Sequence, residues 1–159
     1  MSHKIRDARP DEADALTALC MRSKAHWGYD ADFMERCREG LRVGADAIRD
    51  GRVLVVIDAQ DRPLGVAQFD LQAETADLGL LFVDPPAIGW GVGRALLREA
   101  LKRAAAAGAH RLTILADPNA AGFYEAMGAR YLREAPSDAI PGRSLPLYEM
   151  PLPAGLRAA

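Results

Sequence analysis

The stretch from Leu78 to Arg94, LGLLFVDPPAIGWGVGR, decides the fold of this chain. An apolar, strand-like run to Val83 is followed by glycines at positions 89, 91 and 93 and then by a helix-like sequence. Glycine has no Cβ, so the backbone of such a loop can approach a ligand closely. A helix that begins here directs unpaired N–H groups and its positive dipole end toward the loop, an arrangement that binds phosphate. The stretch therefore predicts a strand–loop–helix site for a phosphate-bearing ligand.

The spacing of this stretch excludes two common phosphate-binding motifs. A dinucleotide fingerprint needs Gly-x-Gly-x-x-Gly/Ala. Counting from Gly89 places Arg94 at its last position, and counting from Gly91 places Leu96 there. A P-loop needs Gly-Lys followed by Ser or Thr, and the sequence contains no Gly-Lys pair.

A βαβ unit surrounds the loop. The strand around 78–83 is followed by the clearest helix of the chain, at 93–107, with Gly108 as its stop. The apolar side of that helix is formed by Leu97, Leu101 and Ala104. A second strand is expected at 111–116, so the two strands form a parallel pair.

The other expected elements make a mixed fold with one domain. Strands are expected at 3–8, 53–58, 64–71, 131–133 and 147–150, and helices at about 10–24, 31–41 and 117–128. The fold class is thus α/β in the mixed α+β sense: a mostly antiparallel sheet of six or seven strands, four flanking helices and one parallel pair. A length of 159 residues predicts a single domain over 1–159.

Charge and composition narrow the function classes. The formal net charge of −2 supplies no basic field for nucleic acid or a membrane surface. The longest apolar runs, 53–57 and 78–83, are too short to span a bilayer. The N-terminus shows no signal-peptide pattern, so we expect a cytoplasmic protein. Cys20 and Cys37 lack Cys-x-x-Cys spacing and are expected as buried free thiols. The three histidines have no metal-ligand spacing, so no metal is expected.

Two motifs resemble the GNAT superfamily of acyl-CoA-dependent N-acyltransferases. The loop from Ile88 to Gly93 is similar to its pyrophosphate loop, Gln/Arg-x-x-Gly-x-Gly/Ala. The segment from Asp117 to Ala129 is similar to its Asn-x-x-x-x-Phe-Tyr-x-x-x-Gly-Phe/Ala signature. The resemblance covers about residues 4–152. One departure is Ile88, which stands where the family usually has Gln or Arg and removes a side-chain contact to the phosphates.

The resemblance implies acetyl-CoA as cosubstrate, bound between the two parallel strands. The backbone of Leu81, Phe82 and Val83 would hold the pantetheine arm. The residues whose backbone N–H groups would contact the pyrophosphate are Gly89, Gly91, Val92, Gly93 and Arg94.

The second motif supplies two further candidates by resemblance. Tyr124 would protonate the departing CoA thiolate, or else is a packed tyrosine whose hydroxyl meets water. Asn119 would bond the pantetheine amides, or else is a plain helix N-cap. Phe123 and Met127, four residues apart, are expected in the core.

Transfer of an acyl group to an acceptor amine requires a base. An amine with a pKa of about 10.4 is almost fully protonated at neutral pH, so a proton must leave before nitrogen attacks. Resemblance points to a carboxylate early in the fourth strand, at Asp77, with Glu74 as a nearby substitute. The alternative is that both are solvated charges at the start of a strand.

Two other regions are candidates for acceptor binding. His26, Trp27 and Tyr29 form an aromatic group whose faces suit a cationic or ring-bearing acceptor, or which staples two helices together. Arg143 lies in a loop at about 136–146 and would meet an acceptor carboxylate, unless that loop is only a surface hairpin.

The sequence as a whole favours an N-acetyltransferase that transfers acetyl from acetyl-CoA to a primary amine of a small molecule or peptide. Direct attack in a ternary complex is expected because no cysteine is placed as an acyl carrier. A homodimer is possible, since dimers are common in the superfamily. The alternatives are a non-catalytic acyl-CoA sensor or scaffold and an unrelated nucleotide-binding α/β protein.

Overall fold

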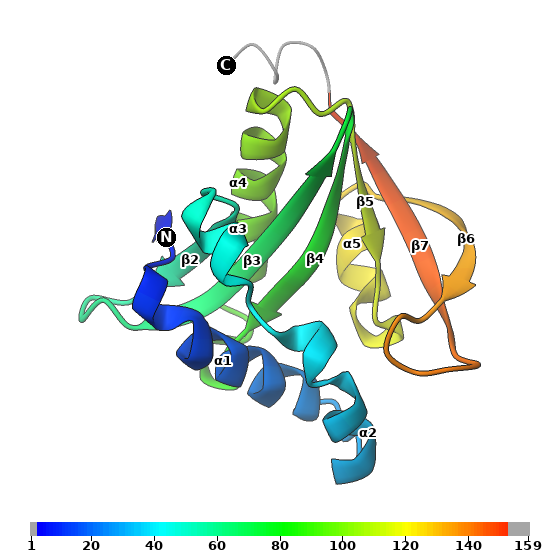
Figure 1. Cartoon of the computed structure of the whole chain (residues 1–159), viewed down its shortest axis with the longest axis horizontal. Coiled ribbons are helices and arrows are strands. Elements are labelled where there is room, and N and C mark those ends of the chain that lie inside the picture. Colours follow the sequence, from blue (N-terminus) through cyan, green and yellow to red (C-terminus); the bar gives the residue numbers. More distant parts are fainter. Residues whose placement is uncertain (1–2, 153–159) are drawn as a thin grey trace. The chain divides into compact units, whose positions relative to one another are not determined.

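A single sheet of seven strands carries the fold of the computed structural model, which describes residues 3–152 (Figure 1). The strand order is β1-β2-β3-β4-β5-β7-β6, and β4 and β5 are parallel. The strands are β1 (Lys4–Asp7), β2 (Val53–Ile57), β3 (Pro63–Gln72), β4 (Thr75–Val83), β5 (Arg111–Leu115), β6 (Arg130–Pro136) and β7 (Ser144–Pro151). The helices are α1 (Ala13–Ala25), α2 (Ala31–Cys37), α3 (Ala45–Arg49), α4 (Val92–Ala106) and α5 (Ala121–Ala126). The mixed α/β fold class expected from the sequence is confirmed.

Two compact units make up the described chain. The first comprises residues 3–69 and 80–100, and the second comprises 70–79 and 101–152. The single domain expected from the sequence stays a prediction.

The core of the first unit is built on β2. All five of its residues, Val53–Ile57, are buried, which agrees with their β-branched, continuously apolar sequence. Antiparallel pairing joins β2 to β1 on one side, with Lys4 opposite Ile57, and to β3 on the other. The start of α4 packs on β3, because Gly65 of that strand lies against Val92 and Leu96.

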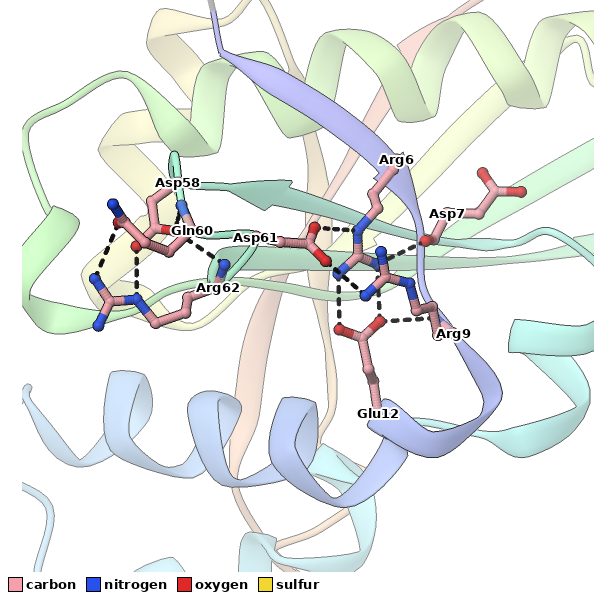
Figure 2. A network of polar contacts seen from close by, with 8 residues as sticks. All are labelled: Arg6, Asp7, Arg9, Glu12, Asp58, Gln60, Asp61 and Arg62. Carbon is pink, nitrogen blue, oxygen red and sulfur yellow. Dashed lines mark hydrogen bonds and ion pairs between the residues drawn. The ribbon is translucent and has the colours of Figure 1, made fainter.

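An ionic network ties together three segments of the first unit (Figure 2). The Arg6 guanidinium donates to both carboxylate oxygens of Glu12, at 2.8 Å each, and to Asp61 Oδ1 at 2.9 Å. Arg9 also pairs with Asp61, at 2.6 Å, and its backbone N–H donates to Glu12 at 2.7 Å. These contacts join β1 to the 3₁₀ turn before α1 (Pro10–Glu12) and to the turn between β2 and β3. The bonds from Arg6 hold the pKa of Glu12 below its usual value.

The second unit has one buried sheet face and one polar face. Alternate residues of β4, β5 and β7 are buried: Ala76, Leu78, Leu112, Ile114, Tyr148 and Met150. Helix α5 packs on this face, since the Tyr148 hydroxyl donates to Glu125 Oε2 at 2.5 Å. The opposite face carries a row of polar residues in register across four strands: Asp77, Thr113, Glu149 and Arg130.

The boundaries expected from the sequence differ from the structure at three places. The helix expected over 31–41 ends at Cys37 and is followed by a 3₁₀ turn, Glu39–Leu41. Helix α3 was not anticipated. The loop expected over 136–146 is shorter, because β6 extends to Pro136 and β7 begins at Ser144.

The two cysteines and the helix lengths agree with the sequence-based expectations. Cys20 and Cys37 are free and buried, as expected, and burial raises the pKa of Cys20 to about 12. Within residues 3–152, none of the helices combines the length and the apolar character that crossing a membrane requires.

Candidate active site

The glycine loop takes the conformation that its sequence predicts. Gly89 and Gly91 have φ angles of +89° and +80°, in the left-handed region that favours glycine. A Cβ at Gly89 would meet no atom within 4 Å, so the backbone angle, and not crowding, requires glycine there. The first backbone bond of α4 runs from the Ala95 N–H to the Gly91 carbonyl, at 3.1 Å.

The start of α4 leaves backbone donors without helical acceptors. Helix geometry leaves the N–H groups of Val92, Gly93 and Arg94 in this state, and the helix dipole adds positive potential there. The Val92 side chain is buried, and Arg94 is exposed. Ile88 and Trp90, on the loop, are 47% and 58% exposed. This is a helix start with the chemistry of an anion site.

His3 is a loop contact that sequence reasoning missed. Its Nε2 donates to the Trp90 carbonyl oxygen at 2.6 Å. The Trp90 N–H donates to the Ala87 carbonyl at 3.2 Å, so the backbone of this residue is held at both ends. No signal in the sequence connects positions 3 and 90.

Gly65 was also missed, although a glycine inside a strand is a signal for close backbone approach. A Cβ there would lie 2.5 Å from Val92 Cγ1, 3.0 Å from Leu96 Cδ1 and 3.1 Å from the Phe82 carbonyl oxygen. Gly65 therefore allows α4 to begin directly against β3 and the end of β4.

The residues proposed for the pantetheine arm form the end of β4. Leu81, Phe82 and Val83 are each half-buried. Just beyond them the Asp84 N–H donates to the Leu64 carbonyl at 2.8 Å, which attaches this end to β3. The parallel pairing of β4 with β5 involves Thr75–Asp77. Leu81, Phe82 and Val83 therefore lie beyond the paired part of β4.

Tyr124 is buried on α5 in the second unit. Its side chain is 5% exposed, and burial together with the charge of Asp117 raises its pKa well above the usual value. Phe123 and Met127 are only half-buried, so the expectation that they form the core of this segment is wrong. The short helix turns Tyr124 inward instead. The Phe123 ring packs edge-on against the Tyr124 ring, with the ring centroids 5.1 Å apart.

Asn119 is not the helix N-cap. Asp117 caps this segment, because its Oδ1 accepts the Asn119 N–H at 2.8 Å. Pro118 follows as the first residue of the turn, a position that proline favours. The Asn119 side-chain amide donates to the same oxygen at 3.0 Å. The N-cap alternative is therefore wrong, and the ligand role of Asn119 stays a prediction.

Asp77 lies on the polar face of the second unit. The Thr113 hydroxyl donates to its Oδ1 at 2.7 Å. Although the residue is exposed at the sheet surface, desolvation of the carboxylate by the surrounding protein raises its pKa. The Thr113 bond lowers it, and the charges of Asp70 and Asp138 raise it further.

The other acceptor candidates of the second unit have structural partners. Glu74 is exposed, with its Oε1 3.7 Å from His110 Nε2, and its carbonyl accepts the His110 N–H at 2.7 Å. Arg143 is half-buried in the loop before β7, and its carbonyl accepts the Ser137 N–H at 2.8 Å. Within residues 3–152, neither side chain makes a hydrogen bond or an ion pair with Asp77, whose carboxylate accepts from Thr113.

The aromatic group of the first unit separates into two pairs. Tyr29 stacks on Phe33 with ring centroids 4.2 Å apart, and Lys24 Nζ lies 5.3 Å from the Tyr29 centroid. His26 and Trp27 are both exposed, and their rings meet edge-on with centroids 6.1 Å apart. The Tyr29 face is thus already occupied by a cation of the protein itself, which favours the stapling role for this residue.

Across residues 3–152, no three His, Cys, Asp or Glu side chains gather as a metal site would require.

Comparison with known proteins places this geometry in a family. The family model described as the Acetyltransferase (GNAT) domain matches residues 27–135. No curated protein matches the chain at a significant level.

Three solved structures illustrate the structural likeness. PaiA N-acetyltransferase from Thermoplasma acidophilum, solved with coenzyme A, is 18% identical over 95% of this chain and 99% of that chain, with a TM-score of 0.76. Apo YjaB from Escherichia coli is 26% identical over 96% and 98%, with a TM-score of 0.67. A phosphinothricin acetyltransferase from Sinorhizobium meliloti, solved with AcCoA, is 20% identical over 96% and 89%, with a TM-score of 0.69.

The family model covers more than two thirds of the sequence and includes both motifs that carry the resemblance. The fold, with its parallel β4–β5 pair and the glycine loop before α4, agrees with it. The chain belongs to the GNAT acetyltransferase family.

Proposed function

We propose that this chain transfers the acetyl group of acetyl-CoA to a primary amine of a small molecule or peptide. The observation that carries the proposal is the loop from Gly89 to Arg94, with two positive φ angles and a helix N-terminus, in a member of the GNAT family.

Acetyl-CoA as cosubstrate is supported by the loop and by the relatives. Backbone N–H groups from Gly89 to Arg94 would bind the pyrophosphate, as helix N-termini bind phosphates elsewhere. This contact does not depend on the side chain at Ile88. PaiA was solved with coenzyme A and the Sinorhizobium enzyme with AcCoA. We propose that this chain binds the same cosubstrate.

The chemical step is direct attack. The amine nitrogen forms a bond to the thioester carbonyl carbon, the C–S bond breaks, and CoA leaves as a thiolate. The ammonium loses one proton before attack, the nitrogen loses a second as the tetrahedral intermediate collapses to the amide, and the thiolate gains one. Because Cys20 and Cys37 are buried, neither is suited to carry the acetyl group.

Tyr124 is proposed as the acid that protonates the thiolate. Its burial raises its pKa, so the phenol holds its proton at neutral pH. Among residues 3–152, the Tyr124 hydroxyl has no hydrogen-bond partner. The Tyr124 ring packs edge-on against the ring of Phe123.

Asp77 is proposed as the base, acting directly or through a water molecule. Desolvation brings its pKa closer to neutral pH than that of an ordinary aspartate, which makes the carboxylate a better proton acceptor. A homodimer and a cytoplasmic location stay predictions of the sequence.

The test is a screen of primary amines with acetyl-CoA, in which released CoA thiol is measured. We expect Y124F to lower kcat by about 10²–10⁴-fold, as loss of a general acid does, with little change in acetyl-CoA affinity. D77N should lower kcat/KM and remove the acid limb of its pH profile. Acetyl-CoA binding without any thiol release across the amines would instead favour the non-catalytic sensor.

A further inference from the structure

Thr113 lies in the polar row of the second unit, second of its four residues. By strand register it lies between Asp77 of β4 and Glu149 of β7. Its hydroxyl donates to Asp77 Oδ1 at 2.7 Å, and the Ala76 carbonyl oxygen is farther away, at 3.4 Å. A hydroxyl carries one hydrogen, so the shorter contact identifies Asp77 as its acceptor.

The side chain of Thr113 is suited to fix a direction. A β-branched residue in a strand has few χ1 rotamers, so its hydroxyl does not swing freely. The bond occupies one carboxylate oxygen of Asp77. Among residues 3–152, Thr113 is the hydrogen-bond partner of this carboxylate, and Oδ2 stays open to another donor.

The next carboxylate of the row does not compete for Thr113. Glu149 accepts from Arg111 at 3.1 Å and from Arg130, and its side chain is 15% exposed. These two guanidinium groups, Arg130 first, hold the pKa of Glu149 below its usual value. Glu149 is therefore ionised and neutralised, and it adds little negative potential at Asp77.

The remaining charges near Asp77 act against its ionised form. Asp70 at the end of β3 and Asp138 in the loop before β7 both raise its pKa, as does desolvation. Glu74, three residues earlier, lies beside His110. Thr113 is the contact that favours the carboxylate.

We propose that Thr113 is a positioning residue for the base: it holds Oδ1 of Asp77 and leaves Oδ2 to take the proton of the acceptor amine. In this step an N–H bond of the ammonium breaks, the proton moves to Oδ2, and the nitrogen keeps the electron pair that attacks the thioester. The inference rests on the proposed function and deepens it.

The test measures the titration of Asp77 directly, by carbon-detected NMR of the labelled protein, with D77N to assign the signal. T113V removes the hydroxyl at nearly constant volume. We expect the Asp77 pKa to rise by about one pH unit, since a hydrogen bond to a charged group stabilises it by that order. T113S should restore the wild-type value. If T113V does not fold, T113A serves the same purpose.

T75V is the matched control. Thr75 lies on the same face of β4, two residues from Asp77, and its hydroxyl accepts from Arg111. It should leave the Asp77 titration unchanged. An Asp77 pKa that is the same in T113V and wild type would overturn the inference.

A kinetic measurement separates this inference from the proposed function. Once an amine is identified, the acid limb of kcat/KM should shift in T113V by the same amount as the NMR pKa. If D77N keeps full activity and an unchanged profile, the assignment of Asp77 as base fails. If D77N loses activity but T113V shows no shift in the profile, only the role of Thr113 fails.

Discussion

Gly65 of β3 and Val92 at the start of α4 are in such close contact that a Cβ on the glycine would lie 2.5 Å from Val92 Cγ1. The same Cβ would lie 3.1 Å from the Phe82 carbonyl oxygen. This contact determines where the N-terminus of α4 lies relative to the end of β4. It therefore links the packing of the first unit to the loop proposed to bind pyrophosphate.

Substitution of Gly65 by alanine should destabilise the protein and weaken acetyl-CoA binding together. Overpacking of this kind costs about 1–3 kcal/mol, and α4 must shift to accommodate the methyl group. Thermal unfolding and isothermal titration with acetyl-CoA measure the two effects. G40A is the control, because a Cβ at Gly40 would meet nothing within 4 Å. A G65A protein with wild-type Tm and affinity would contradict this account.

The Arg6–Glu12 pair should make stability depend on pH. Their side chains are only 17% and 14% exposed, and the folded-state pKa of Glu12 lies below its ordinary value of 4.5. A lowered pKa stabilises the fold above the unfolded-state pKa, and that stability is lost as pH falls through the folded-state pKa. E12Q should thus lower the free energy of unfolding at pH 7 by about 1–3 kcal/mol.

Urea unfolding at pH 7 and at pH 3 tests this pair, and the difference between E12Q and wild type should shrink at the lower pH. E39Q is the matched control. Glu39 pairs with Arg42 where both side chains are largely exposed, at 78% and 63%, so its loss should change stability by no more than about 0.5 kcal/mol. A difference for E12Q that is equal at both pH values would rule out the ionised pair as its source.

Trp90 should report ligand binding at the loop. The chain has two tryptophans, so W27F leaves Trp90 as the only one. Because Trp90 is 58% exposed beside the start of α4, its fluorescence should change when coenzyme A binds. In the W27F background, H3A should weaken binding by about 2–10-fold, the scale of one hydrogen bond, since the Trp90 carbonyl loses its donor.

The control for this titration is H110A, which removes a histidine of the second unit. It should leave the fluorescence titration unchanged. Equal affinities for H3A and its parent would show that the His3 contact does not order the loop.

The chain should unfold in one cooperative transition. β4 and α4 each contribute residues to both compact units, so neither unit can lose these elements alone. Tryptophan fluorescence reports the first unit, and amide exchange at Leu112 and Ile114 reports the second. Coinciding urea midpoints are expected. Two separate midpoints would show that the units are independent domains.

The sequence predicted the loop and the βαβ unit because their signals are local. Glycine spacing and the periodicity of 93–107 do not depend on distant residues. The burial of Cys20 and Cys37 was also predicted from their local sequence. These features were enough to identify the family from the motifs in 78–129.

The features that sequence reasoning missed depend on register or on short elements. The bond between Thr113 and Asp77 exists only because the parallel register places them side by side. Helix α3 has five residues, too few for a helical period to be recognised. In α5, with six residues, the spacing of Phe123 and Met127 suggested the wrong buried face.

The most direct test of the central claim is isothermal titration of the wild-type protein with acetyl-CoA, CoA, ATP and NAD, alongside the loop variant G91V. Valine at a φ of +80° is strained, and it would disturb the backbone that is proposed to hold the pyrophosphate. The account predicts binding of acetyl-CoA and CoA to the wild type, none of ATP or NAD, and loss of CoA binding in folded G91V. Absence of CoA binding to the wild type, or undiminished binding to G91V, would contradict it.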